Sequence, residues 1–276
     1  MRGRYIAKRR LEELSYMLSD RDKEILWSLK NCRYLLTSQI QRLHFTDSVS
    51  ATAALRSANR TMTKLKDYGM VESLQRRIGG VRAGSGSYVW TLTESGANLL
   101  HLNDADYSPR KRNFEPSLNF LKHTLEVSEA FIQLTEICRK NNLELLKTEM
   151  EPVCWRAYTG ENGKPASMKP DMFAITANAE FEDNWFIEID MNTESPCVVM
   201  EKCRRYAYYC KIGREQQEYG VFPLVVWIVG SVNRKNNLLQ HIANSREIPE
   251  LSKNIFTVIM PDELEALVCN GKDGTK

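Results

Sequence analysis

Residues 185–191 (WFIEIDM) alternate apolar and acidic side chains, and this pattern limits the fold more than any other stretch of the chain. Successive side chains of a β-strand point to opposite faces, so Glu188 and Asp190 share one face and Ile187 and Ile189 share the other. Two carboxylates in such a strand lie about 6 to 7 Å apart. Their repulsion is about 2 to 3 kcal/mol at an effective dielectric constant near 20. A buried strand of this kind therefore requires a nearby cation, either a metal ion or a Lys or Arg side chain.

The charged residues are unevenly divided along the 276-residue chain, which is long enough for two domains. Residues 1–113 contain 20 Lys and Arg against 11 Asp and Glu, a balance of +9. Residues 114–276 contain 18 against 24, a balance of −6. This asymmetry indicates that the first half meets a polyanion and that the second half has another role. The alternative is that the basic half is only a solvated surface.

Motifs that the sequence lacks narrow the class of protein. No apolar run approaches twenty residues and the N-terminus has no apolar signal segment, so we expect a cytoplasmic protein with no membrane contact. The seven cysteines contain no C-x-x-C pair, which argues against a disulfide framework and a zinc knuckle. No G-x-x-x-x-G-K-[ST] loop is present, so we expect no nucleotide cofactor.

Residues 20–102 have the element order of a winged helix-turn-helix DNA-binding domain. Two short helices precede a longer helix within residues 49–71, and two strands then flank a glycine-rich tip. The apolar stripe of the longer helix is predicted at Leu55, Ala58, Met62 and Leu65. Arg pairs well with guanine and Asn with adenine in the major groove. The predicted DNA-binding residues of this helix are Arg56, Asn59, Arg60, Thr63 and Lys64.

The glycine-rich tip adds three further predicted DNA contacts. Arg76, Arg77 and Arg82 lie on or beside this wing, where they could reach phosphates or a minor groove. Residues 1–19 form a basic N-terminal arm, for which a disordered phosphate-binding segment, a solvated tail and an oligomerisation helix all remain open. Residues 103–116 are polar and contain prolines, so we predict a linker there.

Residues 117–268 are predicted to form a second domain, followed by a tail at 269–276. A long amphipathic helix is followed by a strand within residues 143–159, a second strand in KPDMFAI and a third in WFIEID. A helix, the continuous apolar run FPLVVWIVGS, another helix, a strand and a last helix follow; such a run is typical of a central strand covered on both faces. This order is expected of a PD-(D/E)xK nuclease-like core. The predicted fold is therefore α+β or α/β, with a winged helix-turn-helix before a PD-(D/E)xK nuclease-like α/β domain.

Four segments behind the predicted winged helix carry a resemblance to a known family. They are FLKHTLEVSEAF, KPDMF, WFIEIDMNTES and EKCRRYAYY, in this order. The chain resembles the replication-relaxation family of plasmids and other mobile elements, over about residues 20 to 268. The resemblance implies a role in plasmid replication or DNA transfer.

The nuclease superfamily also implies roles for particular acids. An Asp after Pro and an acid on the next strand bind Mg²⁺ there, and a Lys two residues further on positions the attacking water. The matching positions are Asp171, Glu188 and Asp190, so a carboxylate replaces the expected lysine. Lys202 is the candidate for a migrated lysine, and Tyr206 lies four residues further on the same predicted helix.

Two interpretations of this acidic site follow. In the first, Asp171, Glu188 and Asp190 bind Mg²⁺ or Mn²⁺, with Glu129 or Glu151 completing the shell. In the second, Lys202, Arg205 or both neutralise the acids and the domain is inert. The four histidines form no H-x-H pair, so a relaxase of the tyrosine and histidine-cluster type fits poorly.

The function predicted from the sequence is sequence-specific binding of double-stranded DNA at an origin, transfer origin or promoter, with no cofactor required. The second domain would then serve dimerisation or partner contacts, and a homodimer is expected to be possible. The alternative is a Mg²⁺- or Mn²⁺-dependent DNA nickase or endonuclease.

Overall fold

The structure, a computed structural model, describes residues 6–76, 78, 87–104, 107, 115–191 and 194–270. The chain divides into two compact units, Met1–Ile132 and Gln133–Lys276. Both contain helices and strands, so the protein is of the mixed α/β type that the sequence predicts. Among the described residues, no helix is both long enough and apolar enough to cross a membrane.

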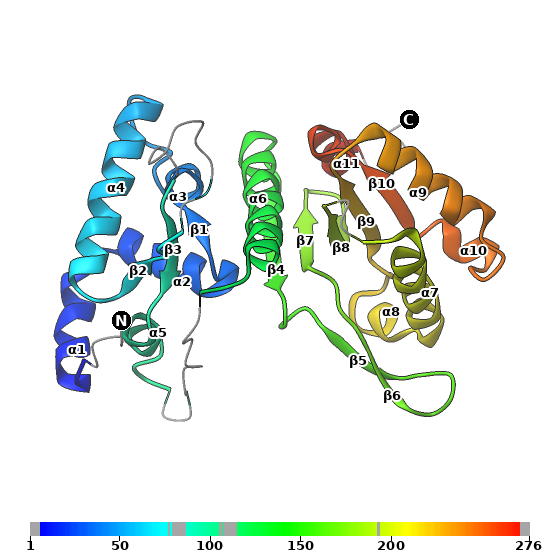
Figure 1. The fold of residues 1–276 in the computed structure, drawn as a ribbon, viewed down its shortest axis with the longest axis horizontal. Coiled ribbons are helices and arrows are strands. Elements are labelled where there is room, and N and C mark those ends of the chain that lie inside the picture. The colour runs from blue at the N-terminus through cyan, green and yellow to red at the C-terminus, as the bar shows by residue number, and fades with distance from the viewer. Residues whose placement is uncertain are drawn as a thin grey trace. The chain divides into compact units, whose positions relative to one another are not determined.

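The first unit places a small sheet among short helices (Figure 1). Its elements are α1 (Lys8–Met17), α2 (Asp20–Cys32), β1 (Leu35–Leu36), α3 (Thr37–His44), α4 (Ala51–Asp67), β2 (Val71–Ser73), β3 (Val89–Leu92) and α5 (Glu94–Leu100). β3 lies between β1 and β2 and is antiparallel to both. A bridge between Ile78 and Ser87 continues the β2–β3 pairing toward the glycine-rich tip. The two strands are therefore antiparallel partners on either side of the glycine-rich tip, as predicted, while residues 77 and 79–86 lie outside the described part.

Helix α4 is the longest helix between α1 and α5, and its sequence explains both of its ends. The Ser50 side chain caps its first turn by accepting a hydrogen bond from the Ala53 N–H (3.2 Å). Gly69 follows the helix with φ of +76°, a conformation that favours glycine. The buried stripe is Ala54, Ala58, Met62 and Leu65. The predicted stripe is thus right at three positions and wrong at Leu55, which is 39% exposed because Ala54 takes the inward position.

Helix α1 settles the structure of most of the N-terminal stretch. Leu11 and Leu14 are buried on one side of the helix, and Leu18 is buried just after it. The helix packs against α5, while Arg10 on its outer side pairs with Glu13. A disordered arm is therefore wrong for residues 8–17, because the leucines provide an apolar stripe that can be buried. Residues 1–5 lie outside the described part of the chain.

Helix α6 (Leu118–Lys140) contains the boundary between the units, which falls after Ile132. Its residues Leu121 and Leu125 pack with Tyr34 and Val89 in the core of the first unit. The helix predicted to open the second domain therefore gives its first half to the first unit. By packing, the division lies further along the chain than the linker predicted at 103–116, where residues 105–106 and 108–114 are outside the described part.

The second unit is built on a five-stranded sheet of order β10-β9-β8-β7-β4. Its elements are β4 (Glu144–Met150), β5 (Arg156–Thr159), β6 (Pro165–Met168), β7 (Met172–Ala177), β8 (Glu182–Asp190), α7 (Pro196–Ile212), α8 (Arg214–Tyr219), β9 (Leu224–Val229), α9 (Val232–Asn244), α10 (Glu250–Lys253), β10 (Phe256–Ile259), η1 (Pro261–Glu263) and α11 (Leu264–Asn270). β8, β9 and β10 are parallel neighbours, whereas β7 is antiparallel to β4 and β8. The apolar run predicted as a central strand is β9, which lies between β8 and β10 with both faces buried.

One prediction for this unit is wrong. The single strand expected within residues 143–159 is two strands, β4 and β5, separated by a turn at Glu151–Cys154. Pro152 lies in this turn and has no N–H to donate to a sheet, which favours a break there. β5 pairs with β6 instead, and the two form a hairpin that extends away from the five-stranded sheet (Figure 1).

Candidate functional site

The outer face of α4 presents basic and amide side chains to solvent. Arg56, Asn59, Arg60 and Thr63 are all exposed. Neither Arg56 nor Arg60 pairs with an acid among the described residues. Asn59 donates to the Leu55 carbonyl (3.0 Å), and Thr63 donates to the Asn59 carbonyl (2.9 Å), so both side chains are held against their own helix. This face therefore presents two exposed guanidinium groups that no described acid neutralises.

A shallow open hollow of about 540 Å³ runs along the C-terminal half of the same face. It is lined by Asn59, Arg60, Thr63, Lys64, Asp67 and Tyr68. Four of these six residues are predicted DNA contacts, so the structure brings that part of the predicted set together on one surface.

Lys64 has a structural partner that the sequence does not reveal. Its Nζ donates to Asp22 Oδ2 (2.6 Å), and the Asp22 side chain is almost completely buried. Asp22 also accepts from the N–H of Ser19 (2.9 Å) in the capping box of α2. Burial alone would raise the pKa of Asp22, but the hydrogen bonds from Lys64 and Ser19 outweigh it and hold the pKa below its ordinary value. Lys64 therefore joins α4 to α2, and its role as a DNA contact stays a prediction.

Of the three arginines predicted on the wing, only Arg76 lies among the described residues. The Arg76 N–H donates to Glu115 Oε1 (2.8 Å), and its guanidinium lies 3.5 Å from the Pro116 carbonyl. Arg76 thus contacts the segment just before α6 while its side chain stays exposed. Arg77 and Arg82 lie outside the described residues, so their predicted role stays a prediction.

The second candidate site surrounds Glu188 on β8, whose side chain is 1% exposed. Tyr206 of α7 donates its hydroxyl to Glu188 Oε1 (2.6 Å). Lys202, one turn earlier on α7, donates to Glu188 Oε2 (3.1 Å) and also pairs with Glu194 (3.1 Å). The i, i+4 spacing of Lys202 and Tyr206 explains why both reach the same carboxylate.

Asp190 is neutralised by a different helix. Arg234 Nε of α9 donates to Asp190 Oδ2 (2.6 Å), and the Asp190 side chain is completely buried. A second nitrogen of Arg234 donates to the Glu194 carbonyl (2.8 Å). The cations that balance the two acids are therefore Lys202 and Arg234. The first was predicted from the sequence and the second was not, because Arg234 is 44 positions from Asp190 with no motif to connect them.

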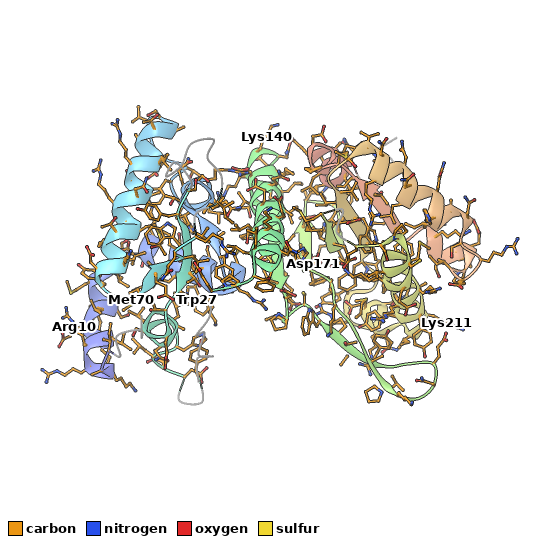
Figure 2. The ribbon with its side chains drawn as sticks, viewed as in Figure 1. Arg10, Trp27, Met70, Lys140, Asp171 and Lys211 are labelled. Atoms are coloured by element: carbon orange, nitrogen blue, oxygen red, sulfur yellow. The ribbon has the colours of Figure 1, made fainter. Side chains whose placement is uncertain are left out.

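Asp171, labelled in Figure 2, lies immediately before β7. Its N–H donates to the Ile187 carbonyl (3.2 Å), and its carboxylate accepts from the Ile189 N–H (2.8 Å). Asp171 thus binds the β8 backbone on either side of Glu188, through its main-chain N–H on one side and its carboxylate on the other. Asp171, Glu188, Lys202 and Tyr206 form one cluster, in which burial and Asp171 raise the pKa of Glu188 and Lys202 and Tyr206 lower it.

Ionisation in this cluster is strongly affected by burial. Burial raises the pKa of Glu188 to about 8; nearby Asp171 adds to the rise, and Lys202 and Tyr206 oppose it. Burial alone would lower the pKa of Lys202, but Glu188 and two neighbouring acids outweigh it, so the pKa lies above its ordinary value. Burial and the adjacent Glu188 raise the pKa of Tyr206 well above its ordinary value. The Tyr206 hydroxyl therefore keeps its proton, which does not suit a nucleophile.

The arrangement does not fit a Mg²⁺ or Mn²⁺ site. Within the described ranges, no group of three or more His, Cys, Asp or Glu side chains is placed to hold a metal ion. Glu188 is bound by Lys202 and Tyr206, and Asp190 is bound by Arg234. Glu188 and Asp190 are thus each paired with a cation of the chain itself, which does not suit the binding of Mg²⁺ or Mn²⁺.

Two further residues weighed from the sequence lie elsewhere. Glu129 accepts from Gln39 (3.0 Å) and Arg42 (2.5 Å) of α3, so it does not complete a shell around Glu188. Arg205 pairs with Glu201 of its own helix (3.2 Å) and does not neutralise the acids. Both corrections reflect contacts that cannot be predicted from spacing alone.

A change at Lys202 gives a pH-dependent prediction. Because the folded pKa of Glu188 exceeds its ordinary value of 4.5, the folded state keeps a proton that the unfolded state loses, and stability falls as pH rises toward about 8. Lys202→Met removes the ammonium and should raise this pKa further. We expect a loss of about 1 to 2 kcal/mol at pH 6, where the Glu194 pair and the hydrogen bond to the protonated Glu188 are lost. The loss should grow by up to about 1.4 kcal/mol per pH unit above pH 8.

Urea denaturation at pH 6 and pH 9 measures this difference. Lys211→Met is the matched control, because Lys211 is exposed at the end of the same helix (Figure 2). A Lys202→Met loss that is equal at both pH values would show that Glu188 does not carry the effect.

Comparison with known proteins identifies a family for this chain. The family model described as Replication-relaxation matches residues 26–225, a range that includes α4 and the acidic cluster around Glu188. No curated protein and no solved structure matches the chain. The match covers more than half of the chain.

Proposed function

The chain belongs to the replication-relaxation family, and from this premise we propose that it binds double-stranded DNA in a sequence-specific manner. Membership implies a role in the replication of a plasmid or another mobile element. The observation that carries the proposal is the outer face of α4, where Arg56 and Arg60 are exposed with no acid partner among the described residues. Guanidinium groups presented in this way suit guanine edges and phosphates.

The arrangement of the first unit supports a winged helix-turn-helix assignment. The order α2, β1, α3, α4, β2, β3, with β3 between β1 and β2, is the order that this motif requires. In this assignment α4 is the recognition helix that enters the major groove, and α2 packs behind it through the Asp22–Lys64 pair. The β2–β3 hairpin is then the wing, and its arginines contact the backbone.

For the second unit we propose a nuclease-like α/β scaffold that does not cleave DNA. Support comes from the internal pairing of both acids, Glu188 with Lys202 and Asp190 with Arg234. An anion also stands at the position where the nuclease pattern has a lysine, and the two neighbouring cations, Lys202 and Arg234, are already paired with Glu188 and Asp190. The unit is then available for dimerisation or for contacts with other replication proteins.

Selection from a random-sequence duplex library with the full-length protein tests DNA binding. We expect a defined duplex that gives a footprint, with affinity falling by about 0.9 in log units per log unit of salt for each phosphate contacted. A two-fold symmetric footprint with half-sites about one helical turn apart would identify a dimer. Failure to enrich any duplex would contradict the proposal.

The selected duplex and the full-length protein also serve to test the alternative that the protein is a nickase. Supercoiled plasmid carrying the selected duplex is incubated with the protein and Mn²⁺, and the wild type is compared with Glu188→Ala. We expect bound but uncut plasmid in both cases. Nicked product from the wild type and none from the variant would replace the scaffold role of the second unit with a catalytic one.

A further inference from the structure

The N-terminal end of α4 carries exposed methyl groups and no charge. Val49, in the turn before the helix, is fully exposed, and Leu55 is 39% exposed. Ala51 and Thr52 are exposed between them. From Ser48 to Leu55 the sequence SVSATAAL contains no ionisable side chain. The first charged residue of α4 is Arg56, so methyl groups and guanidinium groups occupy successive parts of one surface.

Packing explains why Leu55 belongs to this surface. The inward stripe of Ala54, Ala58, Met62 and Leu65 is complete without it. Leu55 lies at the edge of the stripe, where its neighbours at i−3 and i+4 are the exposed Thr52 and Asn59. Its side chain therefore stands beside the polar outer face and contributes a large apolar group there. Single exposed apolar residues are common on protein surfaces. These residues, however, lie together at the N-terminal end of α4, the helix proposed to recognise DNA.

The major groove offers one apolar group to such a surface. The C5 methyl of thymine projects into the groove, and Ala, Thr and larger apolar side chains contact it. Recognition helices place their N-terminal residues against base edges. We propose that Val49, Thr52 and Leu55 contact thymine methyl groups, an inference that rests on the proposed function. Arg56 and Arg60 would then contact the adjoining bases or phosphates.

Replacement of thymine by uracil tests this directly, because uracil lacks only the methyl group. In the duplex selected by the full-length protein, each thymine inside the footprint is replaced singly by uracil, and the Kd is measured at fixed salt. We expect about a fourfold loss of affinity for each methyl contacted, the equivalent of about 0.8 kcal/mol per buried CH₂. At least one position should show this loss.

Protein variants assign the effect to the cluster. Val49→Ala, Thr52→Ser and Leu55→Ala should each bind the thymine and uracil forms of one position with nearly equal affinity. Leu251→Ala is the control, since Leu251 is an exposed leucine of α10 in the second unit and should keep full discrimination.

The results distinguish a failure of the methyl-reading proposal from a failure of the DNA-binding proposal. If a duplex is bound but no uracil substitution weakens it, the methyl-reading role is overturned and the DNA-binding proposal stands. Discrimination that persists in all three variants would also overturn it. If no duplex is enriched at all, both proposals fail.

Discussion

Arg234→Met should lower the free energy of unfolding of the second unit by about 3 to 5 kcal/mol, because it leaves a buried carboxylate without its cation. The Asp190 side chain is completely buried, and the Arg234 guanidinium is its 2.6 Å partner. The same guanidinium donates to the Glu194 carbonyl, which precedes α7. A single substitution thus removes a buried charge pair and a link to the start of a helix.

Urea denaturation followed by circular dichroism measures this loss, and Arg205→Met is the matched control. Arg205 lies on the surface of α7 and pairs only with Glu201 among the described acids, so its replacement should cost less than about 1 kcal/mol. The double variant Arg234→Met with Asp190→Asn tests the cause. It should recover much of the loss, since the uncompensated charge is gone; equal instability of the single and double variants would assign the loss to packing.

The second large effect is expected in DNA binding. Arg56→Ala and Arg60→Ala should each weaken binding of the selected duplex by about 1 to 3 kcal/mol if the side chain reads a base. The double variant should then bind at least roughly 30-fold more weakly than the wild type. Both side chains are exposed, so the folded state should be unaffected.

Salt titration distinguishes the kind of contact that each arginine makes. Loss of a phosphate contact should weaken all sequences alike and reduce the salt slope by about 1, whereas loss of a base contact should relax specificity at one position. Lys211→Ala, in the second unit, should bind as the wild type does. Full affinity in both arginine variants would show that α4 does not face the groove.

Local patterns predicted the parts of the fold that depend on neighbours in sequence. The alternation in residues 185–191 places Glu188 and Asp190 on one face of β8, and the i, i+4 spacing brings Lys202 and Tyr206 to Glu188. These contacts follow from strand and helix periods alone.

Contacts between distant elements could not be predicted in this way. Lys64 looks like a DNA contact from its place on α4, and only the buried position of Asp22, 42 residues earlier, shows its structural role. Arg234 has no sequence signal at all, since an Arg in the first turn of an amphipathic helix is ordinarily a solvated residue. The predicted stripe took Leu55, the larger of two neighbouring apolar residues, whereas the structure buries the smaller Ala54.

The ion pairs at Glu188 and Asp190 have a consequence for how the protein matures. The cations that pair with these acids, Lys202 and Arg234, belong to the same polypeptide, so every synthesised chain contains one of each. If the second unit is the inert scaffold proposed here, a chelating agent should leave its free energy of unfolding unchanged.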